Sequence, residues 1–166
     1  KRREPLTIVG PVGLENWLER VMESAVPGSA KATRKFDLHL RELAAGTCVD
    51  IGGIRVLGEQ ALHGPPGGPY LCVRVEAEGR SVAYTGDTEW TEALIPIARD
   101  ADLFIAEAYF RDKTVVTHLS LHSIEDHLED LRPKRLILTH MSEEMLAHPD
   151  LAHFETAEDG KTITTA

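Results

Sequence analysis

The chain has 166 residues, of which 42% are hydrophobic and 27% charged, a composition typical of a globular protein of about one domain. Its formal net charge of −9 disfavours a general attraction to nucleic acid or to an anionic membrane. No apolar stretch reaches the length of a transmembrane helix, which argues against a membrane partner.

The two cysteines, Cys48 and Cys72, are far apart in the sequence and form no CxxC pair. Both lie in apolar, strand-like surroundings, so we interpret them as small buried residues of a reducing compartment rather than as a disulfide. We therefore expect a cytoplasmic protein.

The first half of the chain is predicted to be rich in strands. Leu6–Val9 is a short strand closed by Gly10-Pro11, and apolar residues then recur at helical spacing from Leu14 to Met22. Alternating or β-branched runs predict the strands that follow, over residues 36–40, 49–51, 54–62, 70–75 and 81–84.

In the second half, helices and strands alternate. The pattern predicts a helix over 91–99, a strand over 101–106, a helix opened by a capping box at Ser123 and running through Leu131, and a strand over 136–138. Ser142 is expected to cap a short helix, and a last hairpin is expected around residues 158–160. This order predicts an α/β layered fold, and we expect a single domain over residues 1–166.

Three residues of metal-binding types stand where a predicted strand ends. They are His63, Asp87 and His140, and imidazoles with a carboxylate suit zinc or a similar divalent ion. A carboxylate between two cations can also bridge them. The run Gly86-Asp87-Thr88 is equally typical of a surface turn, and a lone histidine is most often structural, so spacing alone leaves both interpretations open.

Three segments together resemble the second half of metallo-β-lactamase-fold hydrolases, and in particular the ribonuclease Z branch. They are Thr85-Gly86-Asp87-Thr88, the run from Ala101 to Ala108, and the run from Leu136 to Ser142. The segment from Leu6 to Pro11 also resembles the one that follows the first metal motif in that family. The resemblance implies an αββα sandwich, of which this chain would lack part of the N-terminal half.

The resemblance also implies roles for five residues. His63 and His140 would each bind one of two divalent ions, most simply zinc, with manganese or iron as alternatives, and Asp87 would bridge the ions. His118 would protonate the leaving group, and Glu107 would orient His118. His122 is a rival for the acid role.

The sequence departs from the family pattern in several places. The hallmark His-x-His-x-Asp-His cluster is absent and would be expected just before Lys1, and Ala106 replaces the usual histidine before Glu107. The long arm that grips tRNA in ribonuclease Z enzymes would lie between His63 and Asp87, where Val75 and Ser81 are joined by a short turn.

These features lead to three hypotheses. The first is a hydrolase that uses a metal-held hydroxide on a small ester, phosphodiester or lactone, with nucleic acid a less favoured substrate and a homodimer a candidate assembly. The second is a ribonuclease Z-type tRNA 3′-endonuclease. The third is a non-catalytic fragment or structural member of the fold, since this chain alone would lack most of the metal ligands.

Overall fold

The computed structural model describes residues 2–164, which form two compact units. One unit ends at Ala44 and the other begins at Ala45. Each is described by itself below, and the single domain expected over residues 1–166 stays a prediction.

The first unit is a β-α-β arrangement. Strand β1 (Leu6–Pro11) is followed by helix α1 (Leu14–Ala25), and β2 (Leu38–Leu43) then pairs with β1 in parallel. The strand and helix predicted here are confirmed. Glu42 accepts a hydrogen bond from the Gly13 amide at 2.8 Å, which ties the start of the helix to β2.

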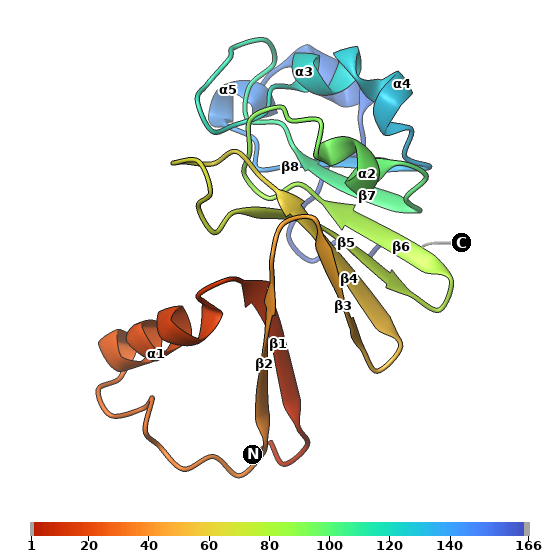
Figure 1. The fold of residues 1–166 in the computed structure, drawn as a ribbon. Helices are drawn as coiled ribbons and strands as arrows, with labels where there is room; N and C mark the ends of the chain where they lie inside the picture. Colours follow the sequence, from red (N-terminus) through yellow and green to blue (C-terminus); the bar gives the residue numbers. More distant parts are fainter. Residues whose placement is uncertain (1, 165–166) are drawn as a thin grey trace. The chain divides into compact units, whose positions relative to one another are not determined.

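The second unit is built on a six-stranded sheet in the order β3-β4-β5-β6-β7-β8 (Figure 1). Its strands are β3 (Thr47–Ile51), β4 (Ile54–Gln60), β5 (Leu71–Ala77), β6 (Arg80–Tyr84), β7 (Leu103–Glu107) and β8 (Leu136–Thr139). The pairs β3–β4, β4–β5 and β5–β6 are antiparallel. The pairs β6–β7 and β7–β8 are parallel. The carboxyl ends of β4, β6, β7 and β8 therefore meet at one edge of the sheet.

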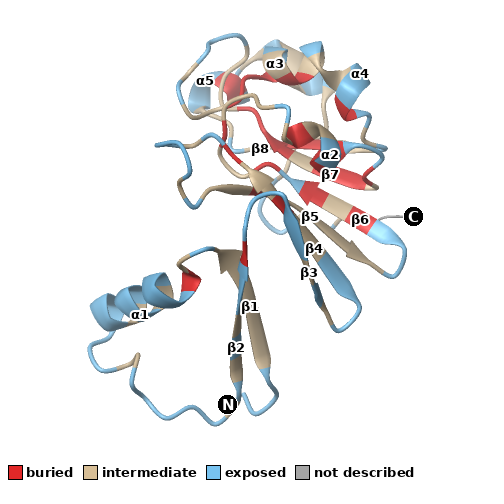
Figure 2. Cartoon of the chain, in the orientation of Figure 1, coloured by how far each residue is buried: buried red, intermediate tan, exposed pale blue. Residues whose placement is uncertain are grey.

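Short helices cover one face of this sheet. They are α2 (Leu94–Ala98), α3 (Leu121–Asp126), α4 (Leu128–Leu131), α5 (Glu143–Leu146) and the 3₁₀ turn η1 (Pro149–His153). The sheet residues Cys72, Ala83 and Phe104 share a core cluster with apolar side chains of α2, α3 and α4. Figure 2 shows the buried residues gathered on β6, β7 and β8, so the parallel strands form the best-packed part of the sheet.

The sequence misplaced two features of this unit. Helix α3 begins at Leu121 because Ser120, rather than Ser123, is its N-cap, with Ser120 Oγ accepting from the Ser123 amide at 3.1 Å. The helix also breaks at His127 before α4 begins. The cap of α5 by Ser142 is confirmed, since Ser142 Oγ accepts from the Met145 amide at 3.2 Å.

The hairpin expected around residues 158–160 is wrong, since the described residues there form no strand. The segment before it lies beside β8 instead. The Leu138 amide donates to the Glu155 carbonyl at 2.9 Å, and the Ala157 amide donates to the Leu138 carbonyl at 2.8 Å. This pairing satisfies the outer side of β8, which would otherwise be an open sheet edge.

The cysteines differ from each other more than the sequence suggested. Both are free, and Cys72 is buried as expected, with burial raising the pKa of its thiol to about 12. Cys48 is exposed, and it lies on β3 at one end of the strand order. In the described part of the chain, no helix is both long enough and apolar enough to cross a bilayer.

Candidate metal centre

The five residues singled out in the sequence meet at the edge where four strands end. His63 follows β4, Asp87 follows β6, Glu107 is the last residue of β7, and His140 follows β8. His118 comes from the long connection between β7 and α3 and faces the same group, 2.9 Å from Glu107. Ligand sites in open α/β sheets lie at the carboxyl ends of strands, and this arrangement follows that rule.

Asp87 lies between two imidazoles. Its Oδ1 is 3.2 Å from His140 Nδ1, and its Oδ2 is 3.8 Å from His63 Nε2. The Asp87 side chain keeps 36% of its surface exposed, so a cation from solvent can reach it. Gly86 before it has φ +60°, a left-handed conformation that favours glycine and turns the chain sharply out of the strand.

Glu107 is the buried counterpart of Asp87, with 1% of its side chain exposed. Its Oε1 accepts from the backbone amides of Thr88 and Leu119, and its Oε2 accepts from His118 Nδ1 at 2.9 Å. His140 Nδ1 is 3.1 Å from the same Oε2. A buried carboxylate with this many donors is held in one orientation, so it can in turn fix the His118 ring.

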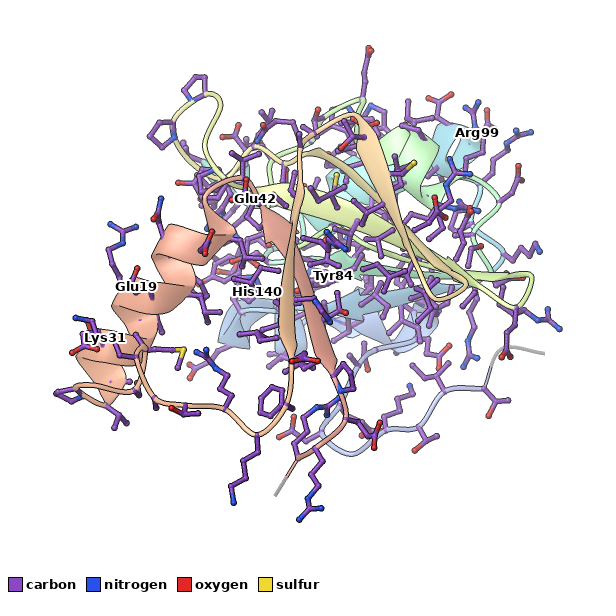
Figure 3. All side chains as sticks on the ribbon, turned by 60° about the horizontal axis from the view of Figure 1, so that its bottom comes forward. Glu19, Lys31, Glu42, Tyr84, Arg99 and His140 are labelled. Atoms are coloured by element: carbon purple, nitrogen blue, oxygen red, sulfur yellow. The ribbon has the colours of Figure 1, made fainter. Side chains whose placement is uncertain are left out.

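Aromatic side chains limit how the His118 ring can turn. Tyr109 stacks on it with ring centroids 4.7 Å apart and planes at 21°, and His63 meets its edge at 5.3 Å. The pKa of the Tyr84 phenol is raised above its ordinary value. Partial burial is the largest cause, and the negative charges of Asp87 and Glu107 add to it. Tyr84 and His140 are both labelled in Figure 3.

Among the described residues, two groups of three donors have atoms within 4.8 Å of one another. They are His63 with Asp87 and His118, and Glu107 with His118 and His140. The expected ligand set of His63, Asp87 and His140 is divided between these groups, and Asp87 is close to both imidazoles separately. The nitrogen and carboxylate donors fit a divalent ion such as zinc.

The other histidines lie elsewhere or serve the fold. His122 Nε2 faces Asp126 at 3.5 Å, and the His122 side chain is 56% exposed, so it lies outside both donor groups. His127 stacks on Trp90 with ring centroids 3.6 Å apart, and its Nδ1 bonds the Ser123 carbonyl at 2.8 Å. His148 accepts from the Asp150 amide at 3.3 Å as the cap of η1.

Sequence reasoning missed the polar residues that support the site. Thr88 is buried, and its hydroxyl accepts from the Leu62 amide at 2.8 Å, directly before His63. Thr117 has φ +75°, and its carbonyl contacts His63 Nδ1 at 3.0 Å. The position of Thr88 next to Asp87 could have signalled its role, but nothing in the local sequence marks the backbone of Thr117.

Comparison with known proteins gives the family. The pattern of the beta-lactamase superfamily domain matches residues 1–141. The chain belongs to this family. Within this family the chain resembles ribonuclease Z, as the motifs around Asp87 and His140 indicated.

Curated relatives named ribonuclease Z match most of the chain. The enzyme of Geobacillus kaustophilus is 29% identical over 190 positions, covering 83% of this chain and 60% of that enzyme. That of Methanosarcina acetivorans is 31% identical over 192 positions, covering 85% and 61%. That of Bacillus subtilis is 29% identical over 141 positions, covering 78% and 43%, so the chain spans about half the length of these relatives.

Solved structures show the same fold. Human tRNase Z, short form, superposes with a TM-score of 0.71 at 23% identity, over 98% of this chain and 67% of that one. Zn²⁺-bound PqqB from Methylobacterium extorquens gives a TM-score of 0.70 at 16% identity, over 96% of this chain and 65% of that one. The expected metallo-β-lactamase α/β fold is confirmed.

Proposed function

We propose that the full-length protein is a metal-dependent hydrolase that cleaves phosphodiester or related ester bonds. The observation that carries this proposal is the meeting of His63, Asp87 and His140 with the Glu107–His118 pair at one edge of the sheet. The family to which the chain belongs supports it.

Three residues would hold the metal. His63 offers Nε2, because its Nδ1 is engaged by the Thr117 carbonyl at 3.0 Å. Asp87 offers two oxygens that face different imidazoles, so it could contribute to an ion held by His63 and to one held by His140. When bound, divalent ions such as zinc, manganese or iron would supply Lewis acidity and lower the pKa of a water molecule.

The Glu107–His118 pair would supply the proton that the leaving group needs. Glu107 Oε2 accepts from His118 Nδ1 at 2.9 Å, so the carboxylate stabilises the ring when it is protonated. His118 Nε2 is then the nitrogen that can give a proton to the leaving oxygen of the substrate. Tyr109 keeps the ring plane fixed by stacking on it.

The test is metal analysis of the full-length protein together with hydrolysis of a model phosphodiester, a carboxylic ester and a lactone. We expect at least one bound divalent ion per chain, hydrolysis of the diester, and loss of both properties in Asp87→Ala. Fewer than one ion per chain together with unchanged hydrolysis in Asp87→Ala would contradict the proposal and favour a non-catalytic member of the fold.

A ribonuclease Z-type tRNA endonuclease is the second candidate, because the curated relatives carry that name. They do not support a preference for small molecules. The turn that joins β5 to β6 consists of two residues, Glu78 and Gly79, because β5 ends at Ala77 and β6 begins at Arg80. No inserted arm lies between these two strands. The alignment with the Geobacillus kaustophilus enzyme has 190 positions but includes only 83% of the 166 residues of this chain. Some of these positions are therefore residues of that enzyme that have no counterpart in this chain.

Cleavage of a precursor tRNA separates the two candidates. Comparable rates on the tRNA and on the model diester would favour the endonuclease, whereas cleavage of the diester alone would favour a hydrolase of smaller substrates. A cytoplasmic location and a homodimer remain predictions that accompany both candidates.

A further inference from the structure

Thr117 has a backbone conformation that its side chain disfavours. Its φ is +75°, in the left-handed region, where a β-branched residue crowds its own backbone. Such residues persist only when the surrounding contacts hold them, and they cluster at functional sites. The contacts of the Thr117 amide and carbonyl therefore show what the strain serves.

Two side chains hold Thr117 from opposite sides. The Thr117 amide donates to Glu89 Oε1 at 3.0 Å. The Thr117 carbonyl contacts His63 Nδ1 at 3.0 Å. The amide and the carbonyl of Thr117 belong to the two peptide groups on either side of its Cα, so Glu89 holds the first group while the carbonyl of the second contacts His63. By holding the left-handed φ of +75° at Thr117, Glu89 fixes where this carbonyl lies.

The contact with Thr117 selects a tautomer of His63. A carbonyl oxygen only accepts hydrogen bonds, so Nδ1 must carry the proton, and in a neutral imidazole Nε2 then keeps its lone pair. Nε2 is the nitrogen that faces Asp87, at 3.8 Å from its Oδ2. The opposite tautomer would place a hydrogen where a metal donor is needed.

Glu89 is itself anchored next to His63. Its amide donates to the Leu62 carbonyl at 2.9 Å, and the Leu62 amide donates to Thr88 Oγ1 at 2.8 Å. The loop after Asp87, the Leu62–His63 segment and the backbone of Thr117 thus form one closed set of hydrogen bonds. A carboxylate at position 89 completes this set.

We propose that Glu89 is a positioning residue that fixes the Nδ1–H tautomer of His63 by holding the backbone of Thr117. The inference rests on the proposed function in one respect, the role of His63 Nε2 as a metal donor. It is tested first on the metal-free protein, where the tautomer of His63 can be observed without a bound ion.

The experiment is long-range ¹H–¹⁵N correlation NMR of the metal-free full chain at about pH 8, where an unperturbed imidazole is neutral. We compare wild type with Glu89→Gln, Glu89→Asp and Glu89→Ala, and use Glu92→Ala, which changes an exposed carboxylate three residues away, as the matched control. Wild type, Glu89→Gln and Glu92→Ala should show His63 protonated at Nδ1. Glu89→Ala and Glu89→Asp should show a mixture of tautomers, since neither places an acceptor at the Thr117 amide.

Zinc affinity gives the second readout. By analogy with other residues that orient metal ligands, Glu89→Ala should weaken zinc binding about 10- to 100-fold, whereas Glu89→Gln should stay close to wild type. A His63 that keeps the Nδ1–H form in Glu89→Ala and Glu89→Asp would overturn the proposal, as would a wild-type His63 protonated at Nε2. If Glu89→Ala does not fold, the contrast between Gln and Asp still decides.

The two proposals can fail separately. Wild-type protein that binds no zinc would contradict the proposed function, while the tautomer spectra would still decide the role of Glu89.

Discussion

The parallel strands carry an aspartate at each end, and the surroundings of these two aspartates differ. At the amino-terminal edge, Asp102 precedes β7 and is surrounded by donors, with Lys134 Nζ at 2.8 Å, Arg80 Nη1 at 3.7 Å and the Ser81 amide at 2.8 Å. At the carboxyl-terminal edge, Asp87 follows β6 and lies beside the imidazoles of His140 and His63. The first aspartate is neutralised by the protein, whereas the second is placed to meet a cation.

The contrast shows how this sheet separates stability from chemistry. Asp102 links the beginnings of β6, β7 and the segment before β8, so it fastens the strands to one another. Asp87 contributes little to holding the strands together, because its side chain is partly exposed and its neighbours are other candidate ligands. In α/β folds the amino-terminal ends of strands commonly serve stability and the carboxyl ends carry the site.

The largest expected effect comes from the matched pair Asp87→Asn and Asp102→Asn. Asp87→Asn should lower divalent metal affinity by at least about 100-fold, more than the loss of a residue that only orients a ligand. Asp102→Asn should leave the affinity within about twofold, because it changes the other edge. Isothermal titration with zinc measures the affinity of both variants. Equal losses of affinity in the two variants would contradict the assignment of metal binding to the carboxyl-terminal edge and of stability to the amino-terminal edge.

The next effect separates the two candidate acids. His118→Ala should lower kcat on a model phosphodiester by about 100-fold or more, because general acid catalysis contributes on that scale. His122→Ala should leave kcat unchanged, since the His122 side chain points to solvent beside Asp126. Steady-state kinetics at a fixed metal concentration compares them, and a larger loss in His122→Ala would reverse the assignment.

Glu107 shows that one residue of the site also serves the fold. Glu107→Ala removes the acceptor of the buried Thr88 and Leu119 amides and should lower the free energy of unfolding by about 3 kcal/mol. Asp87→Asn, at a partly exposed side chain, should change it by less than about 0.5 kcal/mol. Urea denaturation measures both changes, and a loss below about 1 kcal/mol for Glu107→Ala would mean that its neighbours find other acceptors.

The smallest effect is a pH dependence at the amino-terminal edge. The Lys134 ammonium and the Ser81 amide lower the pKa of Asp102 to about 2 in the folded protein, below its ordinary value near 3.8. A depressed folded pKa stabilises the protein above the unfolded value and loses that contribution as the pH falls from about 4 through about 2. Wild type should therefore lose more of its urea midpoint than Asp102→Asn between pH 5 and pH 2.5, and parallel losses would contradict this role.

The sequence predicted most of the fold because its strands carry clear signals. Apolar runs ending in glycine, aspartate or histidine located β4, β6 and β8 and the residues at their tips. The cap of α3 was misplaced by three residues because two serines stand near its start, and only the backbone decides which one accepts. The segment beside β8 was missed because its pairing depends on Leu138, which is distant in the sequence.

The candidate site was predicted less completely. His63, Asp87, Glu107, His118 and His140 could be named from their resemblance to a family, and the structure brings them together, while their roles stay proposals. The contacts of Glu89 and Thr117 could not be predicted, because they depend on a left-handed backbone and on two loops that meet only in the folded chain.

The two thiols give the protein a built-in point for chemical labelling. A maleimide reacts with an exposed thiolate, so it should modify Cys48 on the first strand of the sheet and spare Cys72, which is buried and has a pKa of about 12. A fluorophore on Cys48 would stand five strands away from β8 in the sheet order. Substrate or metal binding could then be followed by fluorescence in the natural sequence, without an added cysteine.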